Sequence, residues 1–160
     1  MNAAAEEGCR LAGPGDLARL VELATLAVGE LGGARGGAVW ARHMARQPPY
    51  ADRLATELGL PGHRVVVGTV DDIVMGYGVA RVDVLPDDGR LGVVSDLYTE
   101  PGCRGLGIGE AMMDALVAWC TTQGCFGVDS LALPGDRHTK NFFESFGLVA
   151  RAIIVHRPLP

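Results

Sequence analysis

The six residues from Arg104 to Gly109 have the composition of an anion-binding loop. The run Arg104-Gly105-Leu106-Gly107-Ile108-Gly109 follows an apolar, strand-like stretch and precedes the strongest helical pattern of the chain. A helix that begins this way exposes main-chain N–H groups, and the positive end of its dipole points to the same place. Glycine also lets a phosphate approach the backbone closely. The loop therefore predicts a phosphate-binding site, although a turn that needs glycine only for its torsion angles would look alike.

Two common phosphate-binding loops do not fit these residues. A Walker loop requires Gly-Lys-Ser/Thr, but Gly109 is followed by Glu110, and Lys140 is the only lysine of the chain. A dinucleotide-binding loop requires a third glycine at position 110 or 112, where Glu110 and Met112 stand. Neither loop type is expected.

The strands around this loop follow from alternating apolar residues and turn signals. The turn residues near Asp71 and over 85–90 make the three middle strands an antiparallel meander, because their connections are short. Alternation and short apolar runs predict strands over 9–12, 64–70, 73–84, 91–99, 128–133 and 149–156.

Helical spacing of apolar residues accounts for most of the rest of the chain. Pro48 and Pro49 break one stretch, because proline lacks the N–H donor and restricts the residue before it. Helices are predicted over 16–28, over 108–120, over 139–146 with Gly147 as its C-terminal cap, and as one or two helices within 39–58. The predicted fold is α/β, with a mixed, mostly antiparallel central sheet and flanking helices in a single domain over residues 1–160.

Composition excludes several classes of function. The 160 residues carry a net charge of −5, and the basic residues are scattered, so no nucleic-acid partner is expected and a cationic substrate fits better. No segment reaches the roughly 18 consecutive apolar residues of a membrane span. The N-terminal region has Glu6 and Glu7 where a secretory leader needs basic residues. We therefore expect a cytoplasmic protein without a membrane partner.

The four cysteines do not form a metal-binding pattern. Cys9, Cys103, Cys120 and Cys125 include no Cys-x-x-Cys pair and have no histidines at zinc-ligand spacing. We expect reduced thiols and no metal.

The segment from Leu97 to Gly109 resembles the R/Q-x-x-G-x-G/A signature of the GNAT superfamily of N-acetyltransferases. The likeness extends over the N-terminal strand and helix, the meander, the helix after the loop, and the run Asn141-Phe142-Phe143-Glu144-Ser145-Phe146-Gly147. Only residues 29–61 have no recognisable counterpart, and in that family this stretch helps to shape the acceptor pocket. The resemblance implies a GNAT-like acyl-CoA N-acyltransferase fold and direct transfer of an acetyl group from acetyl-CoA to a primary amine.

In that family the diphosphate of acetyl-CoA lies on the loop amides, and the pantetheine arm pairs with the strand before the loop. Asp136 stands where an asparagine often bonds the pantetheine, and Asn141 is the suggested replacement. The residues that the resemblance places at acetyl-CoA are Leu97, Tyr98, Thr99, Arg104, Gly105, Leu106, Gly107, Ile108, Gly109, Glu110, Asn141 and Phe143.

The reaction needs an oxyanion donor and a route for a proton. A main-chain N–H near Leu97 to Thr99 is the expected support for the developing oxyanion. An amine with a pKa of about 10 is mostly protonated at neutral pH, so a base or a water chain is needed. Asp96 is the candidate base because it lies on the strand that presents the thioester. Alternatively, Asp96 attracts a cationic substrate or caps local backbone.

The leaving thiolate needs little acid assistance, because a thiol has a pKa of about 8.5. Many relatives have a tyrosine at the position of Phe143, so that hydroxyl is absent here. Tyr98 or bulk water is the candidate replacement as proton donor, and the alternative for Tyr98 is a packing role in the pocket wall.

Three classes of function remain in competition at this stage. The first is an N-acetyltransferase that acts on a small amine, such as a polyamine, amino acid or aminoglycoside, or on an amine of a protein or peptide. The second is a non-catalytic acyl-CoA-binding or sensor module. The third, a nucleotide-dependent oxidoreductase, requires NAD binding that displaces CoA. A homodimer is a possible assembly.

Overall fold

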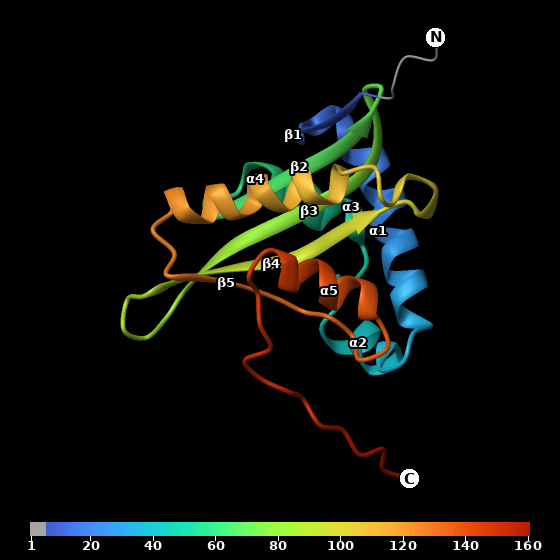
Figure 1. Cartoon of the computed structure of the whole chain (residues 1–160), viewed down its shortest axis with the longest axis vertical. Helices are drawn as coiled ribbons and strands as arrows, with labels where there is room; N and C mark the ends of the chain where they lie inside the picture. Colours follow the sequence, from blue (N-terminus) through green and yellow to red (C-terminus); the bar gives the residue numbers. More distant parts are fainter. Residues whose placement is uncertain (1–5) are drawn as a thin grey trace.

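The computed structural model describes residues 6–160 and contains a five-stranded sheet between two layers of helices (Figure 1). The strands follow one another in space as they do in the sequence, β1 to β5. The first four are antiparallel, and β5 runs parallel to β4, which confirms the predicted mixed sheet. Their bounds are β1 Glu7–Leu11, β2 His63–Val70, β3 Ile73–Val84, β4 Arg90–Thr99 and β5 Gly127–Ser130.

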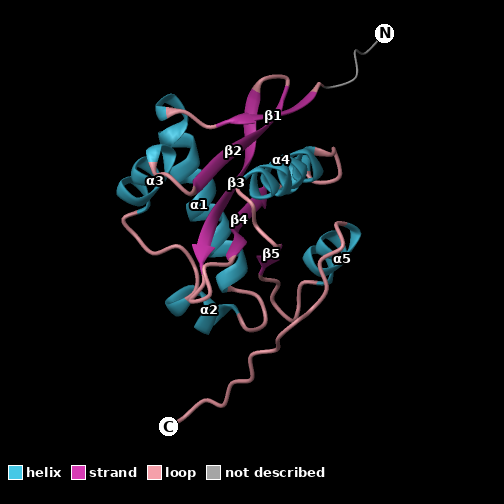
Figure 2. Cartoon of the chain, turned by 90° about the vertical axis from the view of Figure 1, so that its left-hand side faces the viewer, coloured by secondary structure: helices cyan, strands magenta, loops and turns pink. Residues whose placement is uncertain are grey.

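Helices cover both faces of the sheet, as the view along its layers shows (Figure 2). The apolar sides of α1 and α3 pack on one face, and those of α4 and α5 pack on the other. The helices are α1 Leu17–Gly32, α2 Gly37–His43, α3 Tyr50–Gly59, α4 Ile108–Thr122 and α5 Arg137–Ser145, with 3₁₀ turns at Pro14–Asp16 and Pro101–Cys103. The prolines at 48 and 49 separate α2 from α3, as predicted.

One predicted strand is shorter than expected. The sequence predicted a strand over 128–133, but β5 ends at Ser130. Its pairing with β4 runs only from Leu91 opposite Gly127 to Val94 opposite Ser130. Beyond Val94, β4 carries an extra residue, Ser95, relative to β3, and a bulge of this kind bends a strand and interrupts its pairing. The apolar residues after Ser130 therefore lose the ladder that would have kept them extended beside β4.

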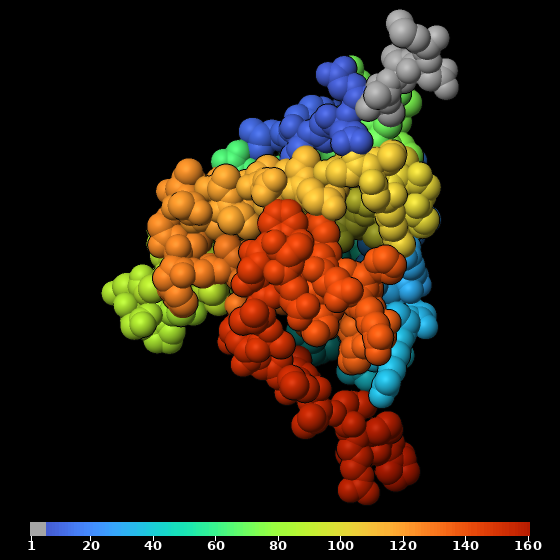
Figure 3. All heavy atoms as spheres, viewed as in Figure 1, coloured from blue at the N-terminus to red at the C-terminus, as the bar shows by residue number. Residues whose placement is uncertain are grey.

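The predicted strand over 149–156 is wrong for this structure. Residues 149–160 form no strand and extend away from the body of the molecule (Figure 3). Val149, Ile153 and Val155 are 78%, 84% and 89% exposed, and an ion pair between Arg151 and Asp129 joins the segment to β5. An alternating pattern indicates that a segment could pair in a sheet, but it does not indicate which strand edge is available. Among the described residues, no strand edge pairs with residues 149–156.

The exposed C-terminal segment predicts self-association. An apolar, extended segment and the uncovered edge of β5 are each prone to pair with another copy. Light scattering over a dilution series should show wild-type protein moving from 16.8 kDa toward twice that mass as concentration rises. The double substitution Ile153→Asp and Ile154→Asp should keep it monomeric. Ile73→Asp, at an isoleucine that is 63% exposed on β3, is the control, and a wild type that stays monomeric throughout would contradict the prediction.

Glycine on the sheet lets α4 lie close to the strands. A Cβ atom at Gly92 would lie 2.6 Å from the Sγ atom of Cys120, and one at Gly78 would lie 3.0 Å from Leu116. Both neighbours belong to the buried side of α4. Some of the 23 glycines of the chain therefore serve packing, and this close packing fixes where the helix begins relative to β4.

Gly92→Ala should lower the free energy of unfolding by about 1–3 kcal/mol, because the added methyl group overpacks the contact with Cys120. Gly29→Ala is the matched control: Gly29 is helical, and an added Cβ there meets nothing within 4 Å. That change should raise stability by up to about 1 kcal/mol. Denaturant titration measures both, and equal stability of Gly92→Ala and wild type would refute the packing argument.

Candidate active site

The site begins where β4 parts from β5. The last pair of the parallel ladder is Val94 with Ser130, and the Ser130 hydroxyl donates to the Val94 carbonyl at 3.0 Å. On its other side β4 stays paired with β3 to Thr99, with the bulge at Ser95. In the described part of the chain, residues 95–99 therefore have a strand partner on one edge only.

The main-chain groups of Leu97 and Thr99 face this open edge. Glu100 N–H donates to the Met75 carbonyl at 2.9 Å, which marks position 100 as directed toward β3. Main-chain groups alternate along an antiparallel pair, so those of Asp96 and Tyr98 also face β3, whereas those of Leu97 and Thr99 face the opening. Consistently, the Thr99 carbonyl accepts a hydrogen bond from Arg104 Nε at 2.9 Å instead of from a strand. The opening thus presents unpaired donors and acceptors to an extended ligand.

The glycine loop places the N-terminus of α4 beside this edge. Gly105 and Gly107 have φ angles of 82° and 92°, which glycine adopts without strain, and Gly107 caps α4 without a side-chain hydrogen bond. The first N–H groups of the helix are therefore not capped by a side chain, and the anion site predicted there stays a prediction. Glu7 Oε2 would lie 2.8 Å from a Cβ atom on Gly107, so a carboxylate already lies against the loop.

The side chain of Arg104 turns toward α1. Its guanidinium contacts Glu30 at 2.8 Å and lies over the ring of Tyr98, 5.5 Å from the ring centroid. The Tyr98 hydroxyl donates to the same carboxylate at 3.1 Å. Burial and then Glu30 raise the pKa of Tyr98, which keeps its hydroxyl protonated. Tyr98 thus has a proton to donate but shares it with Glu30, and its predicted role as acid stays a prediction.

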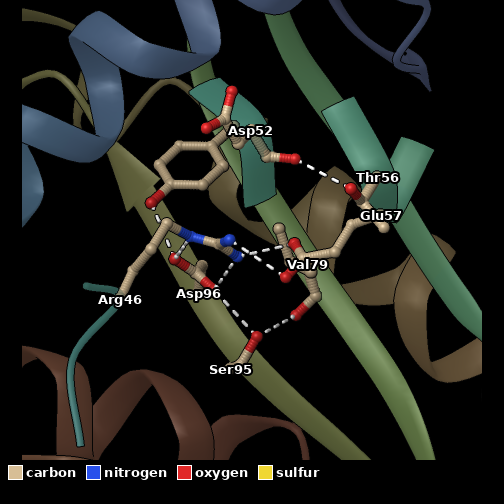
Figure 4. Close-up of polar contacts among 8 residues, drawn as sticks. Arg46, Asp52, Thr56, Glu57, Val79, Ser95 and Asp96 are labelled. Atoms are coloured by element: carbon tan, nitrogen blue, oxygen red, sulfur yellow. Dashed lines mark hydrogen bonds and ion pairs between the residues drawn. The ribbon is translucent and has the colours of Figure 1, made fainter. Parts of the chain in front are cut away.

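Asp96 lies at the centre of a polar network (Figure 4). Its Oδ1 accepts from Arg46 Nε at 3.0 Å and from the Tyr77 hydroxyl at 2.8 Å. Its Oδ2 accepts from Arg46 Nη2 at 2.8 Å and from the Ser95 hydroxyl at 2.7 Å. The Asp96 side chain is 10% exposed. The predicted base is therefore a nearly buried carboxylate with four donors.

Arg46 connects this network to α3. Its side chain is 5% exposed, and it donates to Glu57 Oε1 at 3.0 Å through Nη1. Burial alone would lower the pKa of Arg46, but the hydrogen bonds and charges of Asp96 and Glu57 outweigh it, so its pKa is raised. Burial, followed by the charge of Asp96, raises the pKa of Tyr77 well above its ordinary value. Arg46 and Tyr77 thus keep their protons, and the cluster carries a net charge of −1.

The other predicted cofactor residues lie around the start of α4. Ile108 is buried beneath β2, and Thr99 Oγ1 would lie 3.8 Å from a Cβ atom on Gly109. Leu106 and Glu110 are exposed. The loop, β4 and the first turn of α4 thus form one contiguous region.

The two predicted cofactor residues of α5, Asn141 and Phe143, lie in different environments. Phe142, the neighbour of both, would lie 3.6 Å from a Cβ atom on Gly109, which places α5 beside the start of α4. Asn141 is exposed on α5, whereas Phe143 is buried in the core with α4. Asp136 caps α5 through a 3.0 Å hydrogen bond from Thr139 N–H. Asp136 is therefore engaged within the helix cap rather than free for the pantetheine.

Sequence reasoning missed five residues of this region: Glu7, Glu30, Arg46, Glu57 and Tyr77. Three of them, Glu30, Arg46 and Glu57, lie within residues 29–61, where no motif was recognised. The signal available was indirect, because a charged residue predicted on a buried strand, such as Asp96, requires a partner of opposite charge.

Among the described residues no cluster of His, Cys, Asp and Glu is arranged to hold a metal ion. None of the helices described is both long and apolar enough to cross a membrane.

Comparison with known proteins agrees with this geometry. The sequence matches the Acetyltransferase (GNAT) family over residues 35–148, which is more than half of the chain. The chain belongs to the GNAT family of acetyltransferases. No curated protein sequence matches it.

Several solved structures share the fold of this chain. A mutant of the BH1408 protein from Bacillus halodurans is 18% identical with a TM-score of 0.78, covering 96% of this chain and 99% of that one. Aminoglycoside N-acetyltransferase AAC(6')-Iy in complex with CoA is 15% identical with a TM-score of 0.76, covering 99% and 98%. The aminoglycoside acetyltransferase meta-AAC0020 from an uncultured soil sample, in complex with sisomicin, is 19% identical with a TM-score of 0.68, covering 96% and 95%.

Gly107→Leu should abolish CoA binding without unfolding the protein. The side chain would require a left-handed backbone, collide with Glu7 and cover the helix N-terminus. Calorimetric titration with CoA measures the loss, and circular dichroism checks the fold. Gly102→Ala, where an added Cβ meets nothing within 4 Å, is the control and should bind as wild type does. Undiminished affinity of Gly107→Leu would place the diphosphate elsewhere.

Proposed function

We propose that this GNAT protein is an acetyl-CoA-dependent N-acetyltransferase that acts on a primary amine of a small cationic molecule. The observation that carries the proposal is the open edge of β4 beside the uncapped N-terminus of α4. One feature suits the extended, amide-bearing pantetheine arm, and the other suits the diphosphate. The two features are adjacent, as a single ligand that contains both groups requires.

The residues fit acetyl-CoA in a specific way. The main chain of Leu97 and Thr99 can pair with the pantetheine amides, and the N–H groups of residues 105–109 can hold the diphosphate. The Arg104 side chain, now on Glu30 and the Thr99 carbonyl, would have to release that carbonyl for full pairing. That AAC(6')-Iy was solved in complex with CoA supports the same cofactor here.

The transfer needs little from the protein beyond positioning. The neutral amine attacks the thioester carbonyl, the new C–N bond forms, the C–S bond breaks, and CoA leaves as a thiolate. The bound cofactor supplies the activated acyl group. The Leu97 N–H faces the open edge of β4, and we assign it the role of stabilising the charge that develops on the thioester oxygen. One proton must leave the amine nitrogen, and the thiolate can be released without an acid.

Charge favours a cationic acceptor. Asp96, Glu57 and Arg46 carry a net charge of −1 on the α1 side of β4, and the whole chain carries −5. A field of this sign concentrates cations near the site. The complex of meta-AAC0020 with sisomicin is a structural neighbour that holds an aminoglycoside. We therefore favour small polyamines and aminoglycosides over protein or peptide amines.

The competing proposal is a non-catalytic acyl-CoA sensor, which the absence of a hydroxyl at Phe143 would favour. Release of free CoA thiol from acetyl-CoA distinguishes the two. With a panel of polyamines, aminoglycosides, amino acids and peptides, the enzyme should release thiol in an acceptor-dependent manner. The rate should rise with pH toward about 10, because more of the amine becomes neutral. Tight acetyl-CoA binding without acceptor-dependent release across the panel would support the sensor.

A further inference from the structure

Arg46 is a buried cation in a segment that no sequence motif explains. It lies between α2 and α3, its side chain is 5% exposed, and it reaches β4 to bond both oxygens of Asp96. Burying a charge in this way is costly unless its partners are held in good geometry. A functional role at β4 would offset the energetic cost of burying Arg46.

The carboxylate of Asp96 has no free acceptor site for an additional proton. Each of its oxygens already accepts two hydrogen bonds, from Arg46 with Tyr77 and from Arg46 with Ser95. An ionised carboxylate offers about four acceptor positions in total. Taking the proton of the amine would therefore break at least one of these bonds and set a neutral acid against the Arg46 guanidinium.

The same four hydrogen bonds hold β4 at the bulge, just before Leu97. Asp96 pairs with Val79 directly after the bulge at Ser95, and Leu97 follows with its N–H toward the open edge. Ser95 binds the carboxylate from the bulge itself, and Tyr77, 1% exposed, binds it from β3. Fixing the Asp96 side chain therefore fixes the bulge and, with it, the direction of the Leu97 N–H.

We propose that Arg46, Tyr77 and Asp96 are positioning residues that orient the Leu97 N–H toward the thioester oxygen, and that Asp96 does not accept the proton of the amine. The proton passes instead to water at the opening, which carries it to solvent as a hydronium ion or to buffer. Asp96 then fills the backbone-holding role that the sequence left open as the alternative to a base. The inference rests on the acetyl transfer proposed above.

Tyr77→Phe separates the two roles because they predict opposite effects. This substitution removes the Tyr77 hydroxyl, one of the four donors to Asp96, and leaves the aromatic ring and the net charge unchanged. If Asp96 positions the strand, a looser strand should lower kcat by about fivefold, the equivalent of one hydrogen bond, with little change in KM for acetyl-CoA. If Asp96 is the base, losing a donor makes it a stronger base, and kcat at neutral pH should equal or exceed that of wild type.

The pH profile gives a second, independent readout. Under the proposal, the ratio of the rates of Asp96→Asn and wild type stays constant from about pH 6 to pH 9, because no proton transfer is lost. Arg46→Lys, which keeps the charge but not the paired hydrogen bonds, should recover part of the rate lost in Arg46→Met. A deficit of Asp96→Asn that shrinks as pH rises would overturn the proposal, as would a Tyr77→Phe enzyme as fast as wild type.

The controls keep failure of this inference distinct from failure of the proposed function. Thr121→Val removes a different hydroxyl, one that donates to the Val117 carbonyl near the C-terminal end of α4 and lies outside this network, and it should leave kcat unchanged. Amide hydrogen exchange of β4 needs no turnover: Tyr77→Phe should speed exchange in residues 95–99, and Thr121→Val should not. Unchanged exchange would overturn the positioning role even if no acceptor were found, whereas a wild type inactive toward every amine would count against the proposed function alone.

Discussion

The site depends on one constraint, which is that β4 has a partner along its whole length on one edge and along only four residues on the other. The pairing with β3 holds the strand in place. Its other edge then keeps unsatisfied main-chain groups at Leu97 and Thr99, which a ligand with amide groups can pair. The bulge at Ser95 marks this transition, and a short loop leads from the end of β4 to the uncapped start of α4 at Gly107 and Ile108.

Segments on both faces of the sheet contact that strand. Close packing of α4 over Gly78 and Gly92 sets the position of its N-terminus. On the opposite face, Glu30 from α1 and Arg46 from the connection before α3 reach Tyr98 and Asp96 through charged contacts. Of these contacts the ion pair between Arg46 and Asp96 is the buried one, with side chains 5% and 10% exposed, and such a pair is costly unless its hydrogen bonds are well made.

The sequence predicted the sheet, the helices and the glycine loop well, because periodicity and glycine spacing are local properties. It failed for 149–156 and for the end of β5, since pairing depends on which edge is available rather than on the pattern itself. Within the candidate site, the loop and Leu97 to Thr99 were predicted from a motif. Arg46 and Tyr77 were not, because their contacts with Asp96 span 50 and 19 positions and leave no periodic trace. Glu57 was missed for the same reason, since it joins the network only through Arg46.

The most direct measurement is the change in backbone amide resonances of ¹⁵N-labelled wild-type protein on addition of acetyl-CoA. The account predicts that Leu97, Thr99 and residues 105–109 shift most, with the amides of Asp96 and Tyr98, which face β3, shifting less. Large changes confined to other regions, or none at saturating acetyl-CoA, would contradict it, because the open edge of β4 and the start of α4 would then not form the cofactor site.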